Sequence, residues 1–165
     1  MKTKTKSVAL TGLLIALALV LSYLESLVPL SFAVPGVKLG LPNLVIVFAL
    51  YRLRPSVAAA ISLLRVALVA LLFGSALSLA YSAAGAVLSF AVMLLLKRSG
   101  RFGCTGVSVA GGVAHNLAQI AAAALLLETP SLAWYFPVLC LSGTVAGVVI
   151  GLLSALLVKR IPEYK

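Results

Sequence analysis

The chain contains apolar runs long enough to cross a lipid bilayer, and this feature constrains its fold more than any other. A helix needs about 18 or more residues with few charges to span roughly 30 Å of hydrocarbon. Hydrophobic residues make up 63% of the chain, against roughly 45–50% in soluble domains. We therefore expect an all-α integral membrane protein, one domain over residues 1–165, with six transmembrane helices at approximately 7–28, 40–51, 56–73, 77–96, 105–127 and 132–158.

The second of these segments is short for a full crossing and follows a stretch rich in helix breakers. Residues 29–43, PLSFAVPGVKLGLPN, contain three prolines and two glycines, which interrupt regular helix. Irregular backbone at membrane depth is tolerated only where protein or a water-filled cavity covers it. We therefore expect a loop that dips back toward the membrane, followed by a short helix.

The distribution of basic residues predicts the orientation in the membrane. With the N-terminus in the cytoplasm, eleven of the thirteen Lys and Arg lie on the cytoplasmic side: Lys2, Lys4, Lys6, Arg52, Arg54, Lys97, Arg98, Arg101, Lys159, Arg160 and Lys165. This asymmetry follows the positive-inside rule and predicts a multi-pass protein of the cytoplasmic membrane with both termini in the cytoplasm. Because the net charge of +10 then reflects topology, we expect no nucleic-acid partner.

Lys2 to Lys6 ahead of an apolar run would also fit a signal peptide. The run is long, however, and its only Ala-x-Ala, at Ala16 to Ala18, lies inside it. We therefore expect the first helix to remain part of the protein.

Polar residues inside the apolar segments are the candidate functional residues. Arg65 and His115 each lie about ten residues into a helix that begins at the cytoplasm, which places both near the bilayer centre. An arginine at this depth costs at least roughly 2.5–3.5 kcal/mol on insertion scales, so it should face a partner or a water-filled cavity. Two alternatives stay open for Arg65, an ion pair with Glu25 and a ligand.

Other polar side chains map to the midplane or the outer half of the membrane, where they would form an outward-facing pocket. Lys38, Arg65 and the helix N-terminus at Asn43 favour an anionic or amphiphilic solute, although Glu25 and Glu128 could offset this preference. Hydrogen bonds between helices are the alternative role for His115, Asn116 and Gln119. The candidate substrate-binding residues are Arg65, His115, Asn116, Gln119, Lys38, Asn43, Tyr81, Ser78 and Ser82.

Several chemistries lack their residues in this sequence. The chain contains no aspartate, so neither a Ser-His-Asp arrangement nor an aspartate-rich Mg²⁺ and diphosphate site can be assembled. One His and two distant cysteines, Cys104 and Cys140, do not supply a metal site or a disulfide. No phosphate-binding G-x-x-x-x-G-K-[ST] loop is present. We therefore expect no enzyme activity, no metal and no cofactor.

Small residues recur at helical spacing on three of the expected helices. The stripes Gly143, Gly147, Gly151 and Ala155 and Gly106, Ala110, Ala114, Ala118 and Ala122 predict close packing of the last two helices. Ala9, Gly12 and Ala16 form a third stripe on the first helix. This third stripe fits either packing within the protein or docking of another membrane subunit.

Four ordered motifs resemble those of the Gx transporter family, often labelled heptaprenyl diphosphate synthase component I. They are PGVKLGLPN (35–43), LLFGSALS (71–78), YSAAG (81–85) and HNLAQ (115–119). Ala118 departs from the pattern, because the family has glycine there. The resemblance covers nearly the whole chain and extends in architecture to the substrate-binding S components of energy-coupling factor transporters.

The resemblance implies an S-component-like bundle that captures a small solute from outside. Ala9, Gly12 and Ala16 would dock onto a transmembrane coupling subunit driven by ATPase subunits. Two other classes of function stay open at this point. One is a membrane scaffold subunit of a flavin- or quinone-linked electron-transfer or isoprenoid-related assembly. The other is a proton-coupled carrier, for which the sequence shows neither intramembrane acid clusters nor repeated halves.

Overall fold

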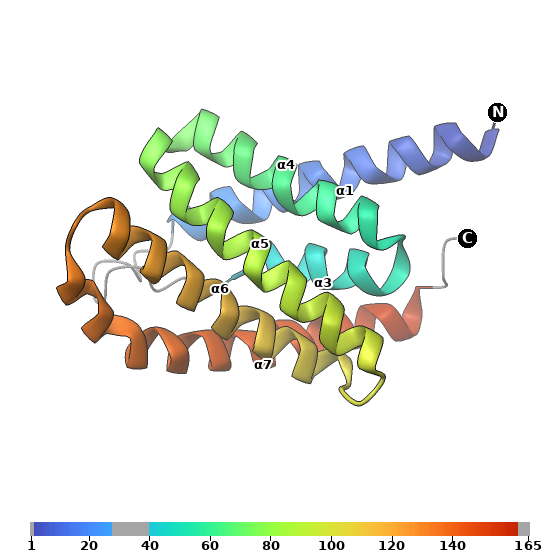
Figure 1. The fold of residues 1–165 in the computed structure, drawn as a ribbon. Coiled ribbons are helices and arrows are strands. Elements are labelled where there is room, and N and C mark those ends of the chain that lie inside the picture. The colour runs from blue at the N-terminus through green and yellow to red at the C-terminus, as the bar shows by residue number, and fades with distance from the viewer. Residues whose placement is uncertain (1, 28–39, 162–165) are drawn as a thin grey trace.

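The structure, a computed structural model, describes residues 2–27 and 40–161. This part of the chain is all-helical, as expected, and forms a bundle of long helices around a short one (Figure 1). Five helices are long and apolar enough to cross a membrane, which supports a multi-pass membrane protein. The elements are α1 (Lys2–Leu27), α3 (Asn43–Arg52), α4 (Pro55–Phe73), α5 (Ala76–Ser99), α6 (Cys104–Leu126), the 3₁₀ helix η1 (Pro130–Tyr135) and α7 (Phe136–Arg160).

The short helix α3 is the centre of the packed core. Its 10 residues span about 15 Å, too little to cross the hydrocarbon. Val45, Ile46, Ala49 and Leu50 of α3 are at most 2% exposed. They pack in one cluster with buried residues of the five long helices: Leu14, Ala18, Ala58, Ile61, Met93, Val107 and Ile150. Of the stretch 29–43 that precedes α3, residues 28–39 lie outside the described part of the chain.

Local sequence signals set the ends of several helices. Ser75 and Ser78 form a capping box at the start of α5, in which Ser78 Oγ accepts from Ser75 N at 2.8 Å and Ser75 Oγ accepts from Ser78 N at 3.1 Å. Gly100 ends α5 in the left-handed conformation, with φ +67°. The last segment begins later than expected, because η1 occupies Pro130–Tyr135 and α7 starts at Phe136.

Glycines bring α6 and α7 into close contact. A Cβ added at Gly147 would lie 2.6 Å from Val109 Cα, and one at Gly151 would lie 2.6 Å from Thr105 Cα. The stripe predicted on the last helix therefore does face α6. The stripe predicted on α6 is wrong in one respect, since Gly106 is exposed and Gly112 is the glycine that meets α7.

Within the described part of the chain, the connections that hold basic residues lie at one end of the bundle. Figure 1 shows the start of α1, the α3–α4 and α5–α6 connections and the end of α7 at this end, which we call the cationic end. It holds Arg52, Arg54, Arg98, Arg101 and Arg160. The α4–α5 connection and η1 lie at the opposite end. This separation is the geometry that the positive-inside rule describes.

Candidate ligand-binding cavity

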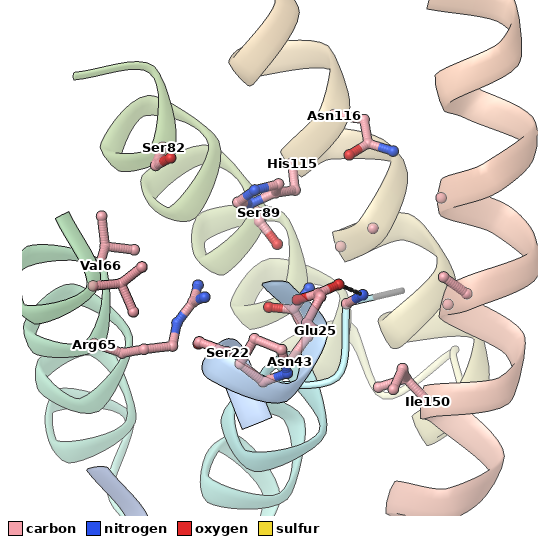
Figure 2. A pocket seen from close by; sticks show the side chains of 18 of the residues that line it. Ser22, Glu25, Asn43, Arg65, Val66, Ser82, Ser89, His115, Asn116 and Ile150 are labelled. Atoms are coloured by element: carbon pink, nitrogen blue, oxygen red, sulfur yellow. Dashed lines mark hydrogen bonds between the residues drawn. The ribbon is translucent and has the colours of Figure 1, made fainter. Parts of the chain in front are cut away.

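A cavity of about 400 Å³ lies inside the bundle and is lined by all six α-helices of the described chain. Its volume falls in the roughly 300–1,000 Å³ range of small-molecule sites. Figure 2 shows side chains of α1, α3, α4, α5 and α6 converging on it. Its polar lining consists of Ser22, Glu25, Ser26, Asn43, Arg65, Ser78, Tyr81, Ser82, Ser89, Ser108, His115 and Asn116.

Arg65 reaches into this cavity from the middle of α4 (Figure 2). Its Nε is buried and has no hydrogen-bond partner in the described part of the chain. Glu25 of α1 lines the same cavity, acts electrostatically on Arg65, and accepts a 2.5 Å hydrogen bond from Gly40 N. The cavity wall therefore holds a cation and an anion close together, and a guanidinium Nε that no residue of the described chain pairs.

His115 enters the cavity from α6, opposite a glycine of α5. A Cβ added at Gly85 would lie 2.9 Å from His115 Cε1 and 3.0 Å from the His115 carbonyl oxygen. Glycine at this position therefore lets the two helices approach and leaves room for the imidazole. This gives a physical role to the last residue of the YSAAG motif.

Asn116 has a partner on the neighbouring helix. Its Nδ2 donates a 2.7 Å hydrogen bond to the Leu139 carbonyl of α7. The same amide lies 2.8 Å from the position of a Cβ on Gly143. For this residue the structure gives the interhelical role that the sequence left open, while the side chain also borders the cavity.

Gln119 lines a different cavity from the other candidates. This second space, of about 180 Å³, is bordered by Tyr81, Gln119, Ile120, Ala123, Leu132, Tyr135 and Leu139. Tyr81 borders both cavities. One turn beyond His115, the α6 surface is covered by η1 and the start of α7, which separates Gln119 from Arg65.

The other predicted binding residues border the main cavity, except for Lys38. Asn43, Ser78 and Ser82 border the main cavity together with Arg65, His115, Asn116 and Tyr81. Ser78 is engaged in the capping box at the start of α5. Lys38 lies outside the described residues.

Sequence reasoning missed two serines deep in the cavity, Ser89 and Ser108. A signal for Ser89 was available, because Ser78, Ser82 and Ser89 are spaced by four and seven residues and share one helix face. Within the described residues, no group of three or more His, Cys, Asp and Glu could hold a metal ion. Cys104 and Cys140 are free thiols there.

The fold and the cavity define a multi-pass helical membrane protein with a ligand-sized space between its helices that is lined by both polar and apolar residues. Residues 14–157 match the family described as heptaprenyl diphosphate synthase component I, and the chain belongs to this family. This confirms the family that the four sequence motifs indicated. No curated protein and no solved structure shows significant similarity to the chain.

Proposed function

We propose that this protein is the membrane substrate-binding subunit of an energy-coupling factor type importer, with no enzyme activity of its own. The observation that carries the proposal is the buried guanidinium Nε of Arg65, which has no partner among the described residues and lies in a cavity of about 400 Å³. A buried polar group without a partner is costly in an apolar medium. A carboxylate or phosphate of a bound solute would supply the missing acceptor.

The position of the cavity supports capture from the side opposite the cationic end. Phe73, Gly74 and Ser78, at the α4–α5 connection, belong to its lining, and so does Ser26, at the last turn of α1. All four residues lie far along the chain from the basic connections. With the cationic end in the cytoplasm, a solute would enter from outside.

The exposed face of α1 supports docking to a partner. Ala9, Gly12 and Ala16 are exposed, and apart from the backbone of α1 itself no atom of the described residues lies within 4 Å of a Cβ added at Gly12. They lie on the side of α1 opposite Leu14 and Ala18, which pack into the core. The expected partners are a transmembrane coupling subunit and ATPase subunits, since this chain has no phosphate-binding loop.

The family label of a synthase is not supported by the residues of this chain. Prenyl diphosphate chemistry requires carboxylate clusters that hold Mg²⁺. The chain has three acidic residues in total, and Glu25 is the only one of them in the described lining of the main cavity. We therefore propose a binding role in place of catalysis.

Native mass spectrometry of the protein extracted from its own membranes tests the proposal. We expect a small-molecule adduct and co-purifying ATPase subunits. In Arg65→Gln the affinity for the adduct should fall about ten- to a hundredfold, because hydrogen bonds to charged groups contribute about 1.5–3 kcal/mol. Arg54→Gln, at the exposed cationic end, is the matched control and should retain it.

Two results would contradict this function. One is equal adduct retention in Arg65→Gln and wild type. The other is co-purification of redox proteins without ATPases, which would make the protein a scaffold subunit.

A further inference from the structure

The floor of the main cavity carries two hydroxyl groups that no residue of the described chain pairs. Ser89 of α5 and Ser108 of α6 are each 4% exposed and line the cavity. Ser22, also in the lining, donates to the Ala18 carbonyl of its own helix at 2.8 Å. Ser89 and Ser108 make no hydrogen bond within the described residues. Buried hydroxyls are normally hydrogen-bonded, so these two have capacity for a ligand.

Both hydroxyls lie deeper in the bundle than His115. Gly85 packs against His115, and Ser89 lies four residues further along α5, about 6 Å toward the cationic end. Ser108 lies seven residues before His115 on α6, about 10 Å toward the same end. Figure 2 shows Ser89 and Arg65 directed into one space from different helices. Arg65 lies ten residues from the start of α4 and Ser89 ten residues from the end of α5, so both are about 15 Å from the cationic end, whereas Ser108, four residues from the start of α6, is about 6 Å from it. The polar groups therefore extend from the level of Arg65 toward the cationic end.

The surroundings of the floor fit an uncharged group. Its other lining residues include Val47, Met93 and Ile150, which are apolar and buried. A Cβ added at Gly111 would lie 3.3 Å from Ser89 Oγ and 2.5 Å from Met93 Cγ. Glycine at this position therefore lets Met93 and Ser89 of α5 pack close to the α6 backbone. The formally charged lining residues of the described chain, Arg65 and Glu25, are on α4 and α1.

We propose that the solute carries, besides an anionic group at Arg65, a neutral hydroxyl, carbonyl or amide group that binds between Ser89 and Ser108, nearer the cationic end. This inference rests on the proposed function and specifies its substrate class. A solute with an alkyl or prenyl tail would leave both hydroxyls buried without a partner. Sites built to hydrogen-bond a substrate group discriminate strongly against analogues that lack it.

The test compares two probes that differ in one hydroxyl, octanoate and ω-hydroxyoctanoate. Each is titrated against the full chain in lipid nanodiscs, and the readouts are the thermal unfolding midpoint and displacement of any co-purified adduct. The variants are Ser89→Ala with Ser108→Ala, and Ser154→Ala as control. Ser154 is fully buried, its Oγ has no partner among the described residues, and it does not line the cavity. Ser154→Ala therefore removes a comparable buried hydroxyl outside the binding site.

We expect wild type and Ser154→Ala to bind ω-hydroxyoctanoate at least about tenfold more tightly than octanoate. The preference should disappear in the double serine variant. Equal binding of the two probes by wild type, a preference that survives in the double variant, or no binding of either probe overturns the neutral binding site at Ser89 and Ser108. An adduct that is present in wild type but insensitive to both serines overturns this inference alone. Absence of any adduct together with absence of ATPase subunits overturns the proposed function itself.

Discussion

At the scale of single residues, the approach of Gly85 to His115 is the contact most sensitive to one added carbon. In Gly85→Ala the new Cβ would lie 3.0 Å from the His115 carbonyl oxygen, a backbone atom that cannot rotate away. We expect a loss of about 1–3 kcal/mol in stability from overpacking, together with weaker solute binding. Thermal unfolding and adduct retention in native mass spectra measure the two effects.

Gly106→Ala is the control for this prediction, because its Cβ would make only ordinary contacts of 3.6 and 3.7 Å with Phe102. If Gly85→Ala and Gly106→Ala unfold at the same temperature, the close approach of Gly85 to His115 does not limit the stability of the protein.

Residue positions along a helix could be predicted from the sequence, but their partners could not. Counting residues from a helix start placed Arg65 and His115 near the middle of their helices, where the structure has them. The sequence does not distinguish Ser22, which donates to its own helix, from Ser89, which does not. Gln119 shares a face with His115, yet η1 and α7 cover its turn of α6. Such coverage depends on tertiary packing.

At the scale of helices, the glycine contacts between α6 and α7 should determine much of the stability of the bundle. In Gly147→Ala the Cβ would lie 2.6 Å from Val109 Cα and 3.1 Å from the Ser108 carbonyl oxygen, so the two backbones must separate. We expect a decrease in stability of about 1–3 kcal/mol, measured as a lower unfolding temperature in detergent. Val149 of the same helix is 52% exposed, so Val149→Ala should change the unfolding temperature little.

The stripe on α1 makes a prediction about a partner helix. Gly12→Leu would add a bulky side chain where no atom of the other described helices lies within 4 Å of the Cβ, so the unfolding temperature should not change. If Ala9, Gly12 and Ala16 dock a coupling subunit, co-purification of that subunit should fall severalfold, because small residues permit close helix approach. Leu17→Trp, exposed on a different side of α1, is the control. Unchanged co-purification would remove the stripe from the interface.

At the scale of the whole molecule, hydropathy predicts the number of long helices but not their neighbours. The apolar runs and helix breakers give the spans, because Pro55, Gly100 and Pro130 interrupt helices locally. They do not reveal that α3 forms the centre of the core or that α6 packs most extensively with α7 and α5. These arrangements follow from side-chain shape, above all from glycines whose contacts lie on another helix.

The segregation of basic residues to one end predicts the direction in which the protein inserts. Lys and Arg near the ends of membrane helices are retained on the cytoplasmic side, so the α5–α6 connection should face the cytoplasm and η1 the outside. Ser99→Cys and Ser131→Cys, both at exposed positions, report on the two ends in a background of Cys104→Ser and Cys140→Ala. A membrane-impermeant maleimide should label Ser131→Cys in intact cells, and Ser99→Cys only after permeabilisation.

The reverse labelling pattern would place the cationic end outside. The α4–α5 connection, whose Phe73 and Gly74 line the cavity, shares its end of the bundle with η1. The labelling experiment therefore also determines from which side of the membrane a solute can approach Arg65. A cytoplasmic position of η1 would be incompatible with capture from outside, even if every binding experiment succeeded.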